Sequence, residues 1–164
     1  MPYDIITQLI SNLDIPFVFE IARIINNEIF FAAFLLLLIF IGEKDRRIKV
    51  LFGLLFVFLI GLTIKELTHI ERPCVELNAK ISCPDSLSFP SNHVILLSAV
   101  VYAFWNKRSR WLYAALLIFV AFTRLYLGVH TLLDVVGGFA LGICGYALFE
   151  FISKQIFKKN ETKI

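Results

Sequence analysis

The sequence predicts an all-α protein, an integral membrane helical bundle with about five transmembrane helices and N-terminal amphipathic interfacial helices. Of its 164 residues 59% are hydrophobic, and the mean hydropathy is +0.79. Soluble domains contain only about 45–50% apolar residues, and a chain this short cannot bury five long apolar runs in its interior. The runs have few breakers and lack the alternating segments of about 10 residues that form outer-membrane barrels, so we expect helices.

Five apolar segments are candidates to cross the membrane, where about 20 residues are needed. They are residues 25–42, 48–64, 91–105, 111–127 and 132–152. The first and third are short for a span. No linker, repeat or low-complexity tract separates them, so residues 1–164 are expected to form a single membrane domain.

Residues 1–24 do not resemble a cleaved signal peptide, because a basic start and a long apolar core are missing. Five apolar side chains fall on one helical face: Ile5, Ile6, Leu9, Ile10 and Leu13. Pro16 separates them from a second amphipathic stretch at residues 17–25. We expect this segment to lie in the membrane interface, either as a plain anchor or as a lid over a binding site.

Positive charge gathers in the loops on one side of the predicted spans. The residues are Lys44, Arg46, Arg47, Lys49, Lys107, Arg108, Arg110, Lys154, Lys158, Lys159 and Lys163. The positive-inside rule then predicts a multi-pass protein with a cytoplasmic C-terminus and an external N-terminus. The small size and bare loops favour a prokaryotic cytoplasmic (inner) membrane. This pattern also explains the net charge of +3, so no nucleic-acid partner is expected.

Three short motifs lie where apolar segments meet polar ones, all on the predicted external side. They are Lys65-x6-Arg72-Pro73, Pro90-Ser91-Asn92-His93 and Thr123-Arg124-x5-His130-x3-Asp134. Cationic side chains bind phosphate oxygens, while histidines serve as nucleophile and acid. Together the motifs indicate a phosphate-transfer site at a membrane surface.

Each motif alone has a structural alternative. Lys65 and Arg72 are seven residues apart, and flanking cations often only extend to the interface. Ser91 could simply cap a helix, although free N–H groups at a helix start, including that of Asn92, also bind anions. His130 could form a merely structural pair with the carboxylate four residues later, although ionisable groups in apolar helices are usually functional.

The three motifs, over residues 65–134, resemble those of the type 2 phosphatidic acid phosphatase superfamily of membrane lipid phosphatases. The resemblance implies that His130 is a nucleophile that forms a phosphohistidine, that Asp134 orients it, and that His93 is the general acid. It further implies a set of phosphate-binding residues: Lys65, Arg72, Ser91, Arg124 and the backbone N–H of Asn92. Asn92 stands where the family usually has glycine, and Thr123 where it usually has serine.

The expected function is therefore a metal-independent membrane lipid phosphatase that removes a terminal phosphate from a lipid phosphate or pyrophosphate. Undecaprenyl diphosphate is the favoured substrate, with relaxed specificity, because the external loops are short. Phosphatidylglycerol phosphate or the 1-phosphate of lipid A are alternatives. No cofactor, metal site or obligate protein partner is expected. A non-catalytic phospholipid transporter is the alternative of another class, and it would keep its binding function without His130.

Two of the three cysteines, Cys74 and Cys83, lie in the predicted external loop at residues 71–89. An oxidising compartment would allow a disulfide between them to persist. Such a bridge would brace the segment between the first two motifs. Two free thiols are the alternative.

Overall fold

The computed structural model describes residues 4–41, 44–75 and 79–161, and every regular element in these ranges is helical. The α-helices are α1 (Ile5–Ser11), α2 (Pro16–Asn26), α3 (Glu28–Ile41), α4 (Arg47–Thr68), α5 (Asn92–Ala103), α6 (Arg110–Tyr126) and α7 (Leu132–Glu161). Two 3₁₀ turns, η1 (Lys44–Arg46) and η2 (Pro73–Val75), lie in the connections. The predicted all-helical class is confirmed.

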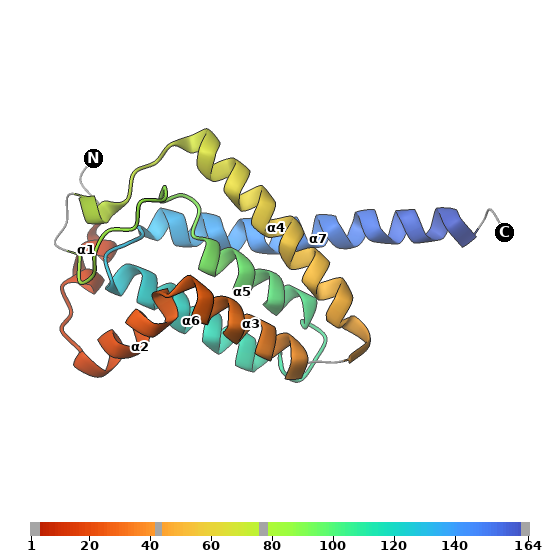
Figure 1. Ribbon diagram of the computed structural model, residues 1–164, viewed down its shortest axis with the longest axis horizontal. Helices are drawn as coiled ribbons and strands as arrows, with labels where there is room; N and C mark the ends of the chain where they lie inside the picture. Colours follow the sequence, from red (N-terminus) through yellow and green to blue (C-terminus); the bar gives the residue numbers. More distant parts are fainter. Residues whose placement is uncertain (1–3, 42–43, 76–78, 162–164) are drawn as a thin grey trace.

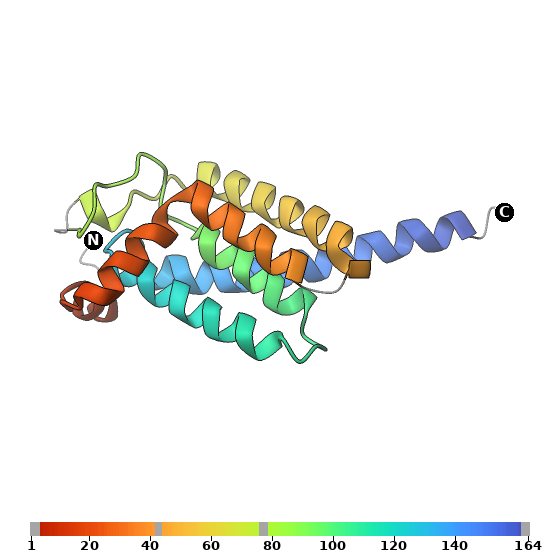
Figure 2. The ribbon, with the colours of Figure 1, turned by 60° about the horizontal axis from the view of Figure 1, so that its bottom comes forward.

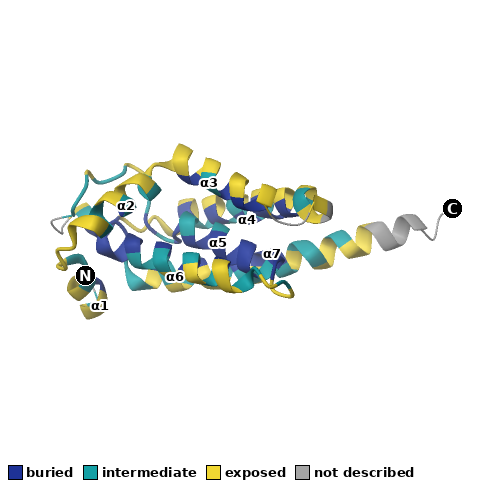
Figure 3. Ribbon diagram, turned by 90° about the horizontal axis from the view of Figure 1, so that it is seen from below, coloured by how far each residue is buried: buried dark blue, intermediate teal, exposed yellow. Residues whose placement is uncertain are grey.

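The helices α3 to α7 run along the long axis of an elongated bundle, and the end of α7 extends beyond the others (Figure 1). Figure 2, in which the molecule is turned by 60°, shows α1 and α2 at the opposite end of the bundle. Helix α5 is central and packs against α4, α6 and α7. Most of its residues are buried, whereas the outer faces of the surrounding helices are exposed (Figure 3).

Two glycines allow α7 to approach the backbone of α5 closely. A Cβ atom at Gly138 would lie 2.9 Å from the carbonyl oxygen of Ser91, and one at Gly142 would lie 2.4 Å from that of Ile95. Side chains at these positions would force the two helices apart. The close contact fixes the start of α5 beside the start of α7.

Two helices in the described part of the chain are long and apolar enough to cross a membrane by themselves. They are α4, with a mean hydropathy of 2.2, and α7 over Leu132–Ile156, with 1.9. The pair α1 and α2 would add a third span if taken together, but it is bent by 109°. Helices α3 and α5 are apolar but shorter, so the predicted number of about five spans is not confirmed.

The N-terminal segment contains two helices at the places where two amphipathic stretches were expected. Asp4 caps α1 by accepting a hydrogen bond from the backbone N–H of Thr7 at 2.8 Å, and Pro16 is the first residue of α2. The apolar segment that follows does not begin at residue 25 as predicted. Asn27 is extended and separates α2 from α3, and its side chain accepts a hydrogen bond from the N–H of Phe30.

Candidate active site

The ends of four helices meet at one end of the bundle, and all three motifs lie there. Helix α4 ends at Thr68, α5 begins at Asn92, α6 ends at Tyr126, and α7 begins at Leu132. Because consecutive helices alternate in direction, residues far apart in the sequence share this end. Gly128, with a φ of +72°, makes the tight turn that leads from α6 to His130.

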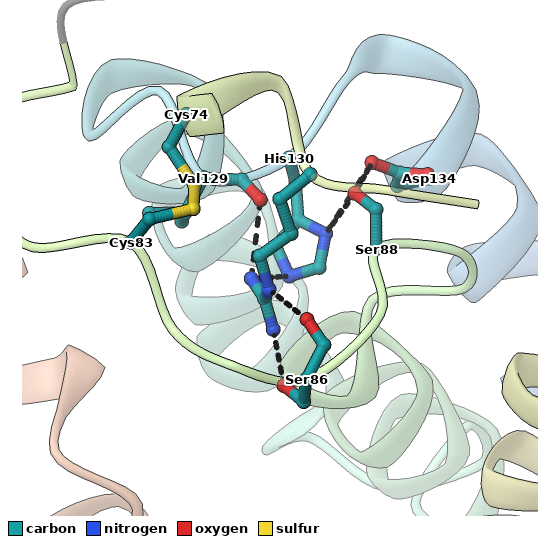
Figure 4. Close-up of a disulfide and its surroundings, with 8 residues drawn as sticks. Cys74, Cys83, Ser86, Ser88, Val129, His130 and Asp134 are labelled. Atoms are coloured by element: carbon teal, nitrogen blue, oxygen red, sulfur yellow. Dashed lines mark hydrogen bonds and ion pairs between the residues drawn. A yellow bond between two sulfur atoms is a disulfide. The ribbon is translucent and has the colours of Figure 1, made fainter. Parts of the chain in front are cut away.

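His130 is buried and lies between a carboxylate and a guanidinium group (Figure 4). Its Nδ1 atom is 3.4 Å from Oδ2 of Asp134 and 3.4 Å from Oγ of Ser88. The Ser88 hydroxyl donates a hydrogen bond of 2.6 Å to the same carboxylate oxygen, and the backbone N–H of Thr131 donates another of 2.7 Å. Asp134 is thus held in place by two donors besides the imidazole.

Arg72 approaches the other side of the imidazole, with Nη1 at 3.2 Å from Nε2 of His130. A guanidinium group can only donate hydrogen bonds, so Nε2 must accept and carries a lone pair. The ring proton then lies on Nδ1 and is donated to Asp134. This tautomer leaves the lone pair of Nε2 facing a positive charge.

Arg72 is itself oriented by a loop residue that the motifs do not contain. Its Nε and Nη2 atoms donate to the carbonyl and hydroxyl oxygens of Ser86 at 2.6 and 2.8 Å, and Nη1 also donates to the carbonyl of Val129 at 3.1 Å. These bonds hold the guanidinium group against His130.

Burial lowers the pKa of His130 to about 4, although the hydrogen bond to Asp134 opposes the shift and the charge of Arg72 reinforces it. Burial also lowers the pKa of Arg72, but a guanidinium group remains protonated in proteins. At neutral pH the site therefore combines a neutral imidazole with a cationic neighbour.

Lys65 is buried, and its ammonium group donates to three backbone carbonyls of the loop before α5. They belong to Leu87, Ser88 and Pro90, at 2.8, 3.1 and 2.9 Å. Three acceptors satisfy all three of its protons. In this structure Lys65 holds the loop that carries Ser88, and its expected contact with phosphate stays a prediction.

The second motif forms the start of α5 as expected, but its three N–H groups are not all free. Ser91 precedes the helix, and its backbone N–H donates to the carbonyl of Asp134 at 3.2 Å. The N–H groups of Asn92 and His93 lie in the first turn of α5, where no intrahelical partner exists. The hydrogen bond between Ser91 and α7 was not predicted from the sequence.

Two side-chain oxygen atoms of this motif are buried without a hydrogen-bond partner. They are the hydroxyl of Ser91 and the side-chain oxygen of Asn92. The Asn92 oxygen faces α4, since a Cβ at Gly61 would lie 3.4 Å from it. The unpaired Ser91 hydroxyl at the start of α5 lacks the partner that a buried polar group normally has, and a ligand oxygen would supply one.

His93 and Arg124 both contact the C-terminal end of α2. The carbonyl of Ile25 lies 3.2 Å from Nε2 of His93, and because a carbonyl only accepts, that nitrogen carries a proton. Arg124 is buried and donates to the side-chain oxygen of Asn26 at 3.0 Å. His93 also lies within electrostatic range of the charges of Arg124 and Arg72.

The structure joins Cys74 and Cys83 by a disulfide with a Cα–Cα distance of 5.5 Å. The bridge lies just before Ser86 in the loop between α4 and α5 (Figure 4), and Cys74 follows Arg72 by two residues. It therefore anchors the chain segment that positions Arg72.

The histidines, the carboxylate and the cations singled out in the sequence lie at this end of the bundle, but the sequence did not single out Ser86 and Ser88. Both serines lie in an irregular loop, where neither helical periodicity nor a motif singles them out. Their partners are distant in sequence, so a local pattern could not have found them. The contacts of His93 and Arg124 with α2 were missed for the same reason.

Helices long and apolar enough to cross a membrane, with a buried histidine between a carboxylate and a guanidinium group at one end of the bundle, are what the phosphatase motifs predict. The chain belongs to the PAP2 superfamily, whose family model matches residues 46–159. This match covers all three motifs, and it confirms the family resemblance inferred from them.

Individual relatives agree with this assignment. An undecaprenyl-diphosphatase from Sulfolobus acidocaldarius is 28% identical over 134 residues, which cover 78% of this chain and 63% of the relative. The chain spans between 32% and 63% of the length of the curated relatives that it matches.

Two crystal structures share the fold. Aquifex aeolicus LpxE has a TM-score of 0.72 at 21% identity, over 88% of this chain and 92% of that one. A transmembrane PAP2 type phosphatidylglycerolphosphate phosphatase from Bacillus subtilis has a TM-score of 0.71 at 22% identity, over 92% and 84% of the two chains.

Proposed function

We propose that this protein is a membrane lipid phosphatase that removes a terminal phosphate from a lipid phosphate or pyrophosphate through a phosphohistidine intermediate. The observation that carries the proposal is the environment of His130, whose Nε2 lone pair faces Arg72 while Nδ1 faces Asp134. Membership of the PAP2 superfamily, with relatives named as phosphatases, supports the reaction class.

In the first step Nε2 of His130 attacks the terminal phosphorus of the lipid. The nitrogen–phosphorus bond forms as the bond from phosphorus to the leaving oxygen breaks. His93 enters this step as the imidazolium ion, gives its Nε2 proton to the leaving oxygen and becomes neutral, and the lipid alcohol or lipid monophosphate departs. Asp134 stabilises the positive charge that develops on the imidazole of His130 through its contact with Nδ1.

In the second step a water molecule attacks the phosphohistidine. His93, now without its proton, accepts a proton from this water, and the nitrogen–phosphorus bond breaks to release inorganic phosphate. His93 thus returns to its protonated state and His130 to its neutral state. The same two histidines serve both half-reactions in exchanged roles.

Cationic groups stabilise the transferred phosphoryl group in this proposal. Arg72 lies beside Nε2 of His130, so a phosphate bound there would replace the imidazole and Val129 as partners of Nη1. Ser91 offers its unpaired hydroxyl, and Arg124 offers N–H groups that now contact α2. Lys65 adds positive charge and supports the loop. Hydrogen bonds from such fixed donors become stronger as negative charge develops on the phosphoryl oxygens in the transition state.

The surface beside the site suits a lipid substrate. A depression of about 700 Å³ lies at the junction of α2 and α3. Its lining is mainly apolar and consists of Arg23, Ile24, Asn27, Ile29, Phe30 and Ala33. Ile24 and Asn27 are sequence neighbours of the residues that contact His93 and Arg124. An acyl or prenyl chain in this depression would bring its phosphate close to the histidines.

Undecaprenyl diphosphate is our favoured substrate, with relaxed specificity. The named activity of the Sulfolobus relative supports this choice. A further relative, the phosphatidylglycerophosphatase B of Bacillus subtilis, supports phosphatidylglycerol phosphate as one alternative, and lipid A 1-phosphate is the other. We further propose that residues 1–164 act as one membrane domain of a prokaryotic inner membrane, with residues 65–134 and the site on the external side and no obligate protein partner.

The test is inorganic phosphate release by the full chain in detergent, with EDTA present, from undecaprenyl diphosphate, phosphatidylglycerol phosphate, phosphatidic acid and lipid A. His130→Asn is compared with His69→Asn, which removes an exposed histidine at the end of α4. We expect release by the wild type and by His69→Asn, and none by His130→Asn. Release that survives His130→Asn would refute the mechanism, whereas lipid binding without any release would favour a transport or binding protein.

A further inference from the structure

A second pocket, lined mainly by polar and charged side chains, lies at the end of the bundle opposite the histidines. Its volume is about 290 Å³, and it is formed by the start of α4, the end of α5 with the following turn, and α7. The lining residues are Arg46, Lys49, Tyr102, Ala103, Trp105, Asn106, Glu150 and Lys154. This is the end at which α7 extends beyond the other helices (Figure 1). None of the three motifs contributes to it.

The pocket carries an excess of positive charge. Three cationic side chains and one carboxylate line it, which leaves a net charge of +2. Lys49 forms an ion pair with Glu150 at 3.1 Å, and Arg46 donates from Nη1 to the carbonyl of Ala103 at 3.2 Å. Among the described side chains Lys154 has no ion-pair partner. The cations therefore retain N–H donors that a bound anion could use.

The pocket lies where the polar and apolar surfaces of the bundle meet. Trp105 is 58% exposed on its rim, as is typical of tryptophan at a membrane interface. Phe52 follows Lys49 by one turn of α4, and Phe151 precedes Lys154 by one turn of α7. Both phenylalanines are 61% exposed. An acyl chain could lie along this apolar surface while its headgroup occupies the pocket.

We propose that this pocket binds the phosphate group of an anionic phospholipid, in the leaflet opposite the histidine site. The ligand chemistry is a phosphate with several acceptor oxygens, for which lysine and arginine are the usual partners. The volume is near the lower end of the range for small-molecule sites, about 300–1,000 Å³, and so fits a headgroup rather than a whole lipid. Basic pockets between membrane helices bind anionic headgroups in the same way.

Free phosphate offers the same oxygens, but the exposed apolar side chains beside the pocket favour a lipid. A soluble anion gains nothing from Phe52 or Phe151, whereas a phospholipid gains the contact of its chain with both helices. The proposal does not rest on hydrolysis at the other end, because none of its residues belongs to the histidine site.

The experiment measures lipid retention by the purified full chain using native mass spectrometry, with phosphatidylglycerol, phosphatidylcholine or inorganic phosphate added. Lys154→Gln removes the pocket cation that, among the described side chains, has neither an ion pair nor a hydrogen bond, and Lys154→Arg restores the charge. Glu150→Gln removes the carboxylate. Arg108→Gln is the matched control, because Arg108 is exposed in the turn at the same end but does not line the pocket.

We expect wild type to retain phosphatidylglycerol over phosphatidylcholine. Lys154→Gln should weaken retention about 5-fold, a typical effect for one basic residue near an anionic lipid, while Lys154→Arg and Arg108→Gln should match wild type. Glu150→Gln should strengthen it, a gain that mere structural damage would not produce. Equal retention of both lipids, equal losses in Lys154→Gln and Arg108→Gln, or binding of inorganic phosphate as strong as that of the lipid would overturn the proposal.

Discussion

Ser88→Ala tests whether the loop before α5 positions the catalytic pair. The Ser88 hydroxyl is fully buried and donates a 2.6 Å hydrogen bond to Asp134, the same carboxylate that faces Nδ1 of His130. Without it, one carboxylate oxygen loses its shortest hydrogen bond, and the imidazole loses part of its support. We therefore expect slower chemistry with little change in KM.

The size of the effect follows from the kind of bond removed. A hydrogen bond to a charged group contributes about 1.5–3 kcal/mol, and each 1.36 kcal/mol changes a rate tenfold. If the whole contribution appears in the transition state, kcat should fall by about 10- to 150-fold. Steady-state phosphate release in detergent micelles measures kcat and KM separately.

Ser98→Ala is the matched control for this substitution. Ser98 is equally buried, and its hydroxyl donates to the carbonyl of Val94 at 2.7 Å within α5, away from the histidines. Its replacement should leave kcat within about twofold of wild type, since it breaks only a neutral bond. A wild-type kcat in Ser88→Ala, or equal losses in both variants, would refute the positioning role.

Three further predictions concern packing, pH and the disulfide. Gly142→Ala should lower the free energy of unfolding by about 1–3 kcal/mol, because the added Cβ would clash with the backbone of Ile95 in α5. Thermal unfolding in detergent should therefore have a lower midpoint temperature than wild type. An unchanged midpoint temperature would contradict the close contact between the two helices. Since burial lowers the pKa of His130 to about 4, the imidazole stays neutral and reactive down to that pH. The acid limb of kcat/KM should therefore lie near pH 4–5, and a limb at about 6.5, the ordinary histidine pKa, would show that His130 is not buried in this way. Replacing Cys74 and Cys83 together by serine should lower the free energy of unfolding by about 3 kcal/mol, as expected for a loop of about 10 residues. It should also raise KM, because the segment that orients Arg72 loosens. A KM equal to that of wild type would show that the bridge does not support the site.

The sequence predicts the helices and the polar end of the bundle well, because apolar runs and helix-start residues are local signals. The spacing of His130 and Asp134 predicts their contact correctly, and the cysteines are joined as the loop position suggested. Boundaries are less predictable. The segment predicted at residues 25–42 begins instead at Glu28, because Asn27 is extended and its side-chain oxygen caps α3.

The roles of individual polar residues depend on tertiary contacts that no local pattern contains. Lys65 is a cation at a helix end, which suggests phosphate binding, yet the folded loop surrounds its ammonium group with carbonyls. Ser88 carries no motif, yet folding brings it to Asp134 across 46 residues. In both cases the partner is set by how the loop between α4 and α5 closes over the bundle.

The central claim is that His130 carries the phosphoryl group, and the most direct measurement is to trap it. The full chain is mixed with lipid labelled with radioactive phosphate on its terminal phosphoryl group, quenched in alkali after milliseconds, and analysed for label bound to protein. We expect alkali-stable, acid-labile label on wild type and on His69→Asn. This label should disappear during a chase with unlabelled lipid. His130→Asn should carry no label. Turnover by wild type without any such label, or label that persists in His130→Asn, would contradict it.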